Sequence, residues 1–269
     1  MQCVLAFEKW ELISIIFLMK DFKGKTVWII GASSGIGEAL AREIADQGGR
    51  LILSARSEDK LNALADDLGD GHIVKPVDCS DAKAMSQVAV SLERLDCVVF
   101  LAAIYTPHSD QPKDIDWTHK ALSVNLGGAF NTVHAALPIF EAQGFGHIAL
   151  CGSVAGYRGL PYGQPYCATK AAIINYAESL KIELEDKNIH VQVINPGFVK
   201  TPLTDKNEFE MPMIIEVDEA AKSLAEGFLS KRFEIHFPKK FTYFMKLIDV
   251  LPKALYFPLS RLMKKKQQD

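Results

Sequence analysis

The chain has 269 residues, 48% hydrophobic and 23% charged, with a formal net charge of −3. This length and apolar content allow one sizeable core, and the absence of a basic stripe interleaved with aromatic residues argues against a nucleic-acid partner. The five cysteines lack C-x-x-C and Cys/His ligand spacing, which indicates reduced thiols, a cytoplasmic location and no metal site.

Residues 1–22 are interpreted as an N-terminal extension that need not belong to the fold. They include the apolar run Leu12–Met19, which is far shorter than the roughly 20 residues needed to cross a bilayer. Glu8 and Glu11 precede the run and no small-residue cleavage site follows, so a signal peptide is not indicated. We expect the folded domain to span residues 23–237 and a separate C-terminal tail to span residues 238–269.

Short β-branched runs alternate with longer amphipathic stretches through the middle of the chain. Strands are predicted at Thr26–Ile30, Arg50–Ser54, His72–Pro76, Cys97–Leu101, His147–Cys151, His190–Asn195 and Phe233–His236. Helices are predicted at Ile36–Gln47, Glu58–Leu68, Asp81–Leu92, Trp117–Phe140, Gln164–Asp186 and Asp218–Leu229. The alternation predicts a Rossmann-type, doubly wound α/β fold: a mostly parallel sheet of seven strands in three α/β/α layers, with ligands at the carboxyl edge.

A glycine-rich turn follows the first predicted strand. It reads Gly31-Ala32-Ser33-Ser34-Gly35-Ile36-Gly37 and leads directly into a helical pattern. Such a turn lets backbone N–H groups and the positive end of a helix dipole meet a pyrophosphate, because no Cβ blocks its approach. The turn between strand and helix therefore predicts a dinucleotide site.

The second predicted strand ends at Leu53-Ser54-Ala55-Arg56. A dinucleotide fold that uses NAD presents an acidic side chain near this point to the ribose hydroxyls, and Ala55 has no carboxylate. Arg56 can form charge-assisted hydrogen bonds to a 2′-phosphate, and Ser33 can add a hydroxyl. The pattern favours NADP over NAD, with a solvated surface charge as the alternative reading of Arg56.

Three residues in the second half form a candidate catalytic group. Tyr166 and Lys170 are four residues apart at the start of a helical pattern, so they share one helix face. Bringing the pKa of a phenol from about 10 to neutrality takes roughly 4 kcal/mol, which a nearby ammonium and an oxidised nicotinamide can supply. Ser153 follows a strand and can hold a substrate oxygen. Asn125 interrupts an apolar helical pattern, where its amide can bind a buried water chain.

These elements together resemble the short-chain dehydrogenase/reductase family over residues 23–237. The resemblance rests on Gly31-x-x-x-Gly35-x-Gly37, Asp78, Asn125, Ser153, Tyr166-x-x-x-Lys170 and Asn195-Pro196-Gly197. It implies a catalytic tetrad of Asn125, Ser153, Tyr166 and Lys170. It also implies that Lys170 bonds the nicotinamide ribose, that Asp78 meets the adenine, and that Val199 and Thr201 hold the carboxamide.

The full set of expected cofactor-binding residues follows from the turn, from Arg56 and from this resemblance. It comprises Gly31, Ser33, Ser34, Gly35, Ile36, Gly37, Arg56, Asp78, Cys79, Ala102, Tyr166, Lys170, Pro196, Gly197, Val199 and Thr201. The sequence departs from the family after the fourth strand, where Asn-Asn-Ala-Gly is usual and Phe100-Leu101-Ala102-Ala103 stands here.

The expected function is an NADP(H)-dependent oxidoreductase that moves a hydride between nicotinamide and the carbonyl or alcohol carbon of a small or lipid-like apolar substrate. Tyr166 is expected to be the general acid/base. A non-catalytic NADP(H) sensor or scaffold on the same fold is the alternative, supported only by Phe100-Leu101. By resemblance, the helices Trp117–Phe140 and Gln164–Asp186 pair between the subunits of a homodimer or homotetramer.

The segments Val154–Pro161 and Thr201–Ile215 are expected to form the substrate walls, and Arg158 is either solvated or a ligand for an acid group. The tail from Lys239 to Asp269 has eight basic and two acidic residues, so its net charge is +6 and the rest carries −9. Phe241, Phe244, Leu247, Ile248 and Leu251 recur there at helical spacing. This tail can pack over the active site or a partner subunit, which we rank first, or dock peripherally on a membrane.

Overall fold

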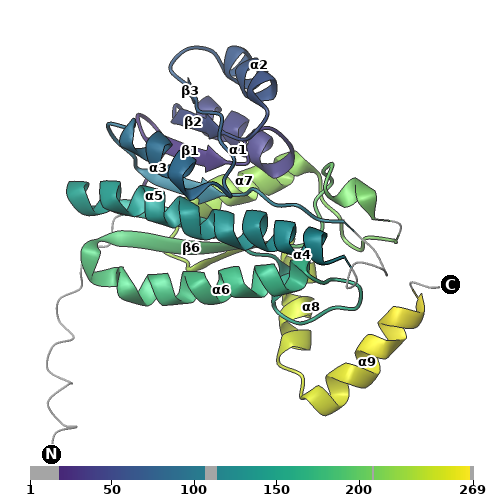
Figure 1. Ribbon diagram of the computed structural model, residues 1–269. Coiled ribbons are helices and arrows are strands. Elements are labelled where there is room, and N and C mark those ends of the chain that lie inside the picture. Colours follow the sequence, from purple (N-terminus) through teal and green to yellow (C-terminus); the bar gives the residue numbers. More distant parts are fainter. Residues whose placement is uncertain (1–17, 107–113, 208, 267–269) are drawn as a thin grey trace, which may run out of the picture.

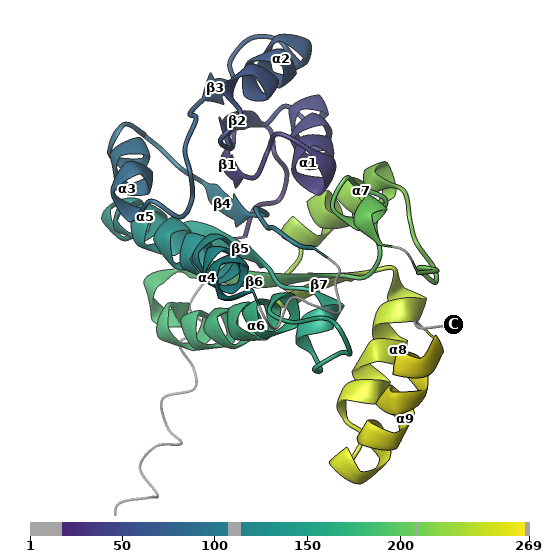
Figure 2. The same ribbon diagram turned by 45° about the vertical axis from the view of Figure 1, so that its right-hand side comes forward.

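In the part of the chain that the structure describes, seven strands form one parallel sheet in the order β3-β2-β1-β4-β5-β6-β7 (Figures 1 and 2). The structure is a computed structural model that describes residues 18–106, 114–207 and 209–266. The strands are β1 (Thr26–Ile30), β2 (Arg50–Ser54), β3 (Ile73–Val74), β4 (Cys97–Phe100), β5 (Gly146–Cys151), β6 (Ile189–Pro196) and β7 (Glu234–Phe237). The helices are α1 (Gly35–Asp46), α2 (Glu58–Leu68), α3 (Ala82–Val90), α4 (Ile115–Ala121), α5 (Gly128–Gln143), α6 (Tyr166–Glu183), α7 (Val217–Phe228), α8 (Lys239–Asp249) and α9 (Lys253–Lys266).

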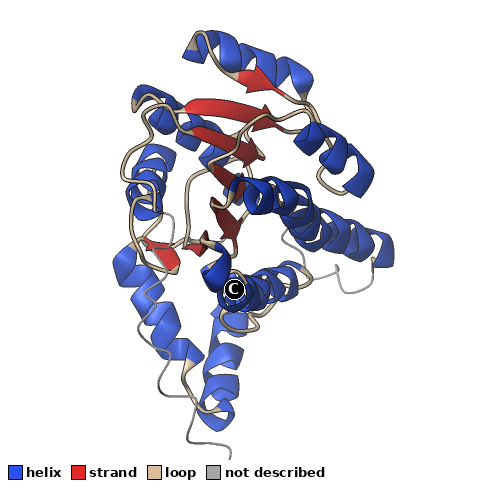
Figure 3. Ribbon diagram, turned by 90° about the vertical axis from the view of Figure 1, so that its left-hand side faces the viewer, coloured by secondary structure: helices blue, strands red, loops and turns tan. Residues whose placement is uncertain are grey.

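Helices cover both faces of the sheet, as Figure 3 shows. On one face α1, α2 and α7 bury residues such as Leu40, Leu61 and Leu224 against the strands. On the other face α3, α5 and α6 bury residues such as Met85 and Ile173. The sheet is therefore apolar on both sides, which explains the continuously apolar strands. The predicted three-layer Rossmann-type fold is confirmed.

Two predicted elements differ in extent from those observed. Strand β3 has only two residues, and Pro76 just after it has no N–H to donate to the ladder. The single helix predicted at Trp117–Phe140 is longer and is divided into α4, a π-helical turn at Leu122–Gly127, and α5. A period of 3.6 residues cannot reveal such a turn, because the apolar face stays nearly aligned across it.

The N-terminal boundary is a correction to the sequence analysis. Met19 and Phe22 are buried in the core beside α1, so the fold begins by residue 19 rather than at residue 23. Residues 1–17, which hold most of the expected extension, lie outside the described residues. Within the described part of the chain, Cys79, Cys97, Cys151 and Cys167 are buried and free, as expected. No described helix is both long and apolar enough to cross a bilayer.

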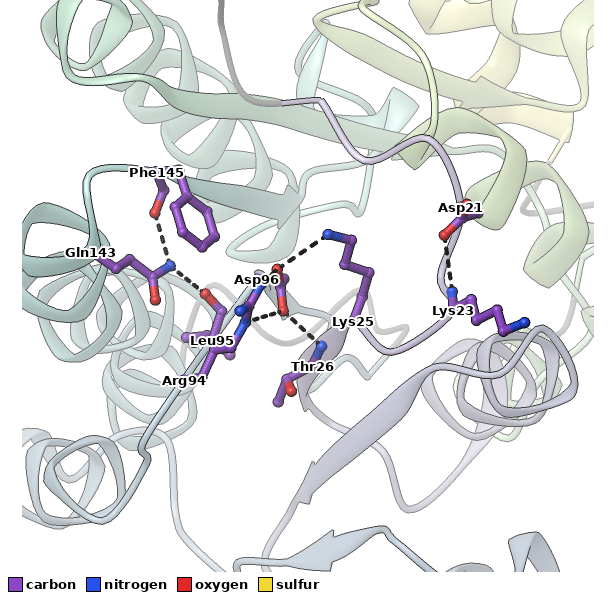
Figure 4. Close-up of polar contacts among 9 residues, drawn as sticks. All are labelled: Asp21, Lys23, Lys25, Thr26, Arg94, Leu95, Asp96, Gln143 and Phe145. Carbon is purple, nitrogen blue, oxygen red and sulfur yellow. Dashed lines mark hydrogen bonds and ion pairs between the residues drawn. The ribbon is translucent and has the colours of Figure 1, made fainter.

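A buried carboxylate ties the amino ends of β1 and β4 together (Figure 4). Asp96 is fully buried and accepts hydrogen bonds from the Thr26 N–H at 3.0 Å and from Arg94 at 3.0 and 3.2 Å. Lys25 adds its ammonium at 3.7 Å. Because these contacts lie at the amino edge of the sheet, they are structural and leave the carboxyl edge for a ligand.

The C-terminal tail folds into two helices beside the carboxyl end of β7. Figures 1 and 2 show α8 leaving the sheet and α9 turning back at an angle to it, so that the pair projects from the α/β body. Phe241, Met245 and Ile248 of α8 and Tyr256 of α9 are buried with Val154 in a small core of their own. One side of the tail is thus part of the fold.

Candidate active site

A cleft of about 510 Å³ opens along the carboxyl ends of the strands. All sixteen residues expected to bind the cofactor line it, together with Ser153. They come from the turns after β1 and β2, the segments after β3 to β6, and the start of α6. The parallel sheet brings these distant segments to one edge, which is why motifs placed after successive strands converge.

The glycine turn packs so closely that side chains cannot be added to it. A Cβ on Gly31 would lie 2.7 Å from the Ala102 nitrogen, and one on Gly37 would lie 2.1 Å from the Gly31 oxygen. Gly35 has a φ of +57° and faces the methyl group of Thr201. The Ser34 side chain does not cap α1, so it does not compete for the N–H groups of the first turn. The first turn of α1 therefore faces the cleft as an anion site.

The end of the cleft next to the turn after β2 carries positive charge. Arg56 and Lys60 are exposed and line it with Ser33, whereas Ala55 offers no carboxylate. Asp78 lies nearby and accepts hydrogen bonds from the Ser80 hydroxyl at 2.7 Å and N–H at 2.9 Å. Burial alone would raise the pKa of Asp78, but the Ser80 hydrogen bonds and the charge of Arg56 outweigh it and lower that pKa. Asp78 is therefore an anionic acceptor at neutral pH.

Ser153, Tyr166 and Lys170 meet at the other end of the cleft. Lys170 is 1% exposed; its ammonium nitrogen donates to the Cys151 carbonyl oxygen at 2.7 Å and lies 5.5 Å from the centre of the Tyr166 ring. The Ser153 hydroxyl accepts the Ala155 N–H at 3.1 Å and faces the Pro196 carbonyl oxygen at 3.4 Å. The predicted i,i+4 pair thus shares one face of α6, beside the serine.

The pKa values of this group reflect its burial. Burial raises the pKa of the Tyr166 phenol, and the Ser153 hydrogen bond offsets only part of that rise. Burial also lowers the pKa of Lys170. Desolvation is the largest effect on the pKa of the phenol. In the protein without cofactor Tyr166 is therefore a neutral phenol that is able to donate a proton.

Asn125 is fully buried in the π-helical turn and supports the cleft indirectly. Its side-chain oxygen accepts the Ile104 N–H at 2.7 Å, and its side-chain nitrogen donates to the Ile104 carbonyl oxygen at 3.0 Å. The amide thus pairs with both backbone polar groups of Ile104, and its nitrogen also lies 3.4 Å from the Thr169 hydroxyl. It does not line the cleft, but it fixes the segment that follows β4.

The segment Phe100-Leu101-Ala102-Ala103, which departs from the family pattern, packs closely against α5 and the glycine turn. Phe100 is fully buried, and a Cβ on Gly128 of α5 would come within 3.0 Å of its ring, so the ring occupies the space that a larger residue at 128 would need. Ala102 and Ala103 line the cleft, and Ala102 backs on to Gly31. Phe100-Leu101-Ala102-Ala103 therefore leaves the glycine turn and the cleft intact.

Residues 25–211 match the family model described as short chain dehydrogenase. The chain belongs to the short-chain dehydrogenase/reductase family. This membership confirms the resemblance drawn from the motifs and makes the protein a member of an oxidoreductase family.

Two curated relatives and one solved structure extend the match. An uncharacterized oxidoreductase of Myxococcus xanthus is 31% identical over 255 residues, which cover 91% of this chain and 100% of that protein. The 17-beta-hydroxysteroid dehydrogenase 13 of Rattus norvegicus is 34% identical over 230 residues, covering 81% of this chain and 76% of that one. A short-chain dehydrogenase from Sphingobium yanoikuyae in complex with NADPH has a TM-score of 0.73 at 26% identity, covering 86% of this chain and 97% of that one.

Residues that the sequence analysis missed lie beside the catalytic group of this short-chain dehydrogenase. The Tyr105 ring packs edge-on against Tyr166 with centroids 5.1 Å apart, and its hydroxyl donates to the Asn207 side-chain oxygen at 3.1 Å. Lys206 lines the cleft and donates to the Tyr105 carbonyl oxygen at 3.3 Å. An aromatic residue soon after a central strand was the available signal for Tyr105, but its pairing with residues about a hundred positions away has no sequence signature.

The segments expected to form the substrate walls lie in two places. Leu203 of the segment Thr201–Ile215 lines the cleft, and Tyr157 and Leu160 pack against α8 and α9. Arg158 is neither solvated nor free for an acid group. Its guanidinium donates to the Asp249 and Leu251 carbonyl oxygens and stacks 4.5 Å from the centre of the Tyr256 ring. The segment after Ser153 is therefore bound to the tail.

Proposed function

We propose that this chain is an NADP(H)-dependent oxidoreductase that interconverts a carbonyl and an alcohol, with Tyr166 as the proton-transferring residue. One observation carries the proposal. A single cleft holds the glycine turn and Arg56 at one end and Ser153, Tyr166 and Lys170 at the other. An extended dinucleotide bound along it would bring its reactive ring to the catalytic group.

The lining of the cleft suits NADP(H). The close contact of Gly31 with Ala102 and the uncapped start of α1 suit a pyrophosphate at the turn. Arg56, Lys60 and the Ser33 hydroxyl of the turn line the same cleft and suit a 2′-phosphate. The NADPH complex of the Sphingobium yanoikuyae relative supports the same assignment. By the family resemblance, Asp78 would meet the adenine, and Val199 and Thr201 would meet the carboxamide.

The bound cofactor would supply or accept the hydride. Within the protein, the Ser153 hydroxyl would bind the substrate oxygen and Tyr166 would give that oxygen its proton during reduction. Burial raises the pKa of the phenol, so Tyr166 holds the proton that reduction needs, and oxidation of an alcohol would return that proton to it. Lys170 would place its positive charge beside the tyrosine as negative charge develops there, and Asn125 would hold the segment at Ile104 in position.

An apolar carbonyl compound suits the substrate end. Ile104, Val124 and Leu203 line the cleft, and Ile104 directly precedes Tyr105, whose ring packs on Tyr166. The name of the rat relative assigns it a hydroxysteroid, a largely apolar alcohol, which supports the same class here. The non-catalytic alternative has lost its support, because Phe100-Leu101 is accommodated without blocking the cleft.

We also propose that the protein is a homodimer or homotetramer paired through α4–α5 and α6. The rings of Phe130 on α5 and Tyr176 on α6 lie 4.1 Å apart, and Phe130 is 38% exposed. An aromatic pair with an exposed surface suits a subunit contact.

Replacement of Tyr166 tests the proposed function. Tyr166→Phe keeps the ring and its packing against Tyr105 but removes the proton donor. Purified protein would be screened with NADPH against ketones, aldehydes and acyl substrates, and cofactor affinity would be followed by fluorescence. We expect turnover to fall by about 10²–10⁴-fold with NADPH affinity nearly unchanged. Substantial residual turnover in the variant, or NADPH binding without turnover in the wild type, would contradict the proposal.

A further inference from the structure

The two C-terminal helices have one buried side and one uncovered side. The buried side packs on Val154, Tyr157 and Leu160. The other side of α8 presents Tyr243, Phe244 and Leu247, and Val250 follows directly after the helix; Val250 is 74% and Leu247 62% exposed. Four large apolar side chains within eight residues are more than a scatter of surface residues.

Helix α9 is still less covered. Among its side chains from Lys253 to Arg261, Tyr256 alone is buried, where its hydroxyl donates to the Gly159 carbonyl oxygen. Leu255, Phe257 and Leu262 are 61%, 52% and 63% exposed. A helix of this length is only marginally stable in water without packing, and Pro258 within it removes a backbone donor. Its helical state points to a surface that covers it.

The charge on these helices indicates which kind of partner covers them. Lys239, Lys240, Lys253 and Arg261 are exposed at the ends and flanks of the apolar face, whereas Lys246 is paired with Glu234. The segment from Lys239 to Asp269 carries +6, against −9 for the rest of the chain. Basic residues around exposed aromatic and aliphatic ones match the headgroup region of an anionic membrane, where long basic side chains reach the phosphates.

We propose that the uncovered side of α8 and α9 docks the protein on an anionic membrane surface. A second copy of the chain is a weaker fit, because a symmetric contact through this face would bring the same basic residues of both copies together. The same helices hold the segment after Ser153 through Arg158. Given the proposed function, docking would set the substrate end of the cleft beside the bilayer, a source of lipid-like carbonyl compounds.

Vesicle co-sedimentation of the full chain tests this partner independently of catalysis. The probes are vesicles of phosphatidylcholine alone and of phosphatidylcholine with 30% phosphatidylglycerol. We expect binding to the anionic vesicles, at least about tenfold weaker binding to the neutral ones, and loss of binding as salt is raised. Equal binding to both kinds of vesicle, or binding to neither, would overturn the proposal.

Matched variants locate the surface. Leu247→Asp places a charge on the exposed face of α8, and Val90→Asp makes the same charge change on α3 at a residue 88% exposed. Lys240→Glu is paired in the same way with Lys83→Glu, which is exposed on α3. We expect the α8 variants to weaken binding at least about tenfold and the α3 variants to leave it nearly unchanged.

Two further measurements separate loss of membrane binding from misfolding and from loss of a subunit contact. Turnover of a water-soluble carbonyl substrate should be the same in all four variants, which shows that the fold and the catalytic group are intact. The mass in solution, from light scattering, should also be unchanged. A lower mass for Leu247→Asp with wild-type vesicle binding would overturn the proposal and identify the face as a subunit contact.

Discussion

Lys170 holds its ammonium nitrogen 5.5 Å from the centre of the Tyr166 ring, one turn along α6. The same nitrogen donates to the Cys151 carbonyl oxygen at 2.7 Å, so the end of β5 fixes the lysine in place. The pair thus depends on a strand and a helix that meet only in the folded protein. Burial lowers the pKa of Lys170, so its charge is lost at a lower pH than that of an ordinary lysine.

Lys170→Met should lower kcat/KM by about 10²–10³-fold, because a buried positive charge beside the reacting oxygen is removed. The alkaline limb of the wild-type pH profile should lie below the ordinary lysine pKa of 10.5 and should disappear in the variant. Lys181→Met, on the same helix and paired with Glu185, serves as the control. A wild-type pH profile in Lys170→Met would contradict the role given to this lysine.

Arg56 should decide between the two nicotinamide cofactors. Arg56→Ala should raise the KM for NADPH about tenfold and leave the KM for NADH nearly unchanged, because only NADPH carries the 2′-phosphate. The effect is modest because the guanidinium is exposed and solvent screens its charge. Steady-state kinetics with both cofactors measure it, and Arg232→Ala, at an exposed arginine before β7, is the control. Similar efficiency with both cofactors in wild type and variant would refute the NADP preference.

The sequence predicted the sheet edge and most of the cleft because both follow from local order. Gly31, Arg56 and Ser153 each come within two residues of the end of a strand, and parallel strands end at one edge. Tyr166 and Lys170 needed only helical spacing. Motif position and topology together therefore fixed which residues line the cleft before any contact was known.

What the sequence did not reveal depends on contacts between distant segments. Asn125 binds the backbone of Ile104 from 21 residues away, and Arg158 binds the carbonyl oxygens at the end of α8. The raised pKa of Tyr166 likewise results from burial, which spacing does not encode. The i,i+4 pattern predicted that Lys170 lies near the phenol. It could not show whether burial or nearby charge has the larger effect on the pKa of Tyr166.

Asp96 should contribute to stability rather than to turnover. Asp96→Asn keeps an oxygen for the Thr26 N–H but removes the charge that pairs with Arg94 and Lys25. We expect the free energy of unfolding to fall by about 2 kcal/mol, less than for a wholly buried pair because Arg94 is well exposed. Urea unfolding measures the loss, and the exposed Asp66→Asn of α2 is the control. An unchanged unfolding midpoint would contradict this assignment.

His190 should make the fold sensitive to acid. Its ring is 3% exposed and lies 4.8 Å from the ring of His147, and burial with the charge of Lys181 lowers its pKa to about 4. Between pH 6.5 and 4 the unfolded chain binds a proton that the folded protein does not. The stabilising contribution of the neutral His190 is therefore fully present above about pH 6.5. As the pH drops to 4, the free energy of unfolding falls by roughly 3 kcal/mol through this group.

His190→Phe should flatten this loss, because an apolar ring of similar shape remains buried without a titrating group. Urea unfolding at several pH values between 4 and 7.5 compares the variant with wild type and with His134→Phe, which replaces an exposed histidine of α5. His147 also has a pKa lowered by burial, so part of the acid loss should persist until it too is replaced. The prediction fails if the free energy of unfolding of His190→Phe falls with decreasing pH as steeply as that of the wild type. The acid loss would then come from groups other than His190.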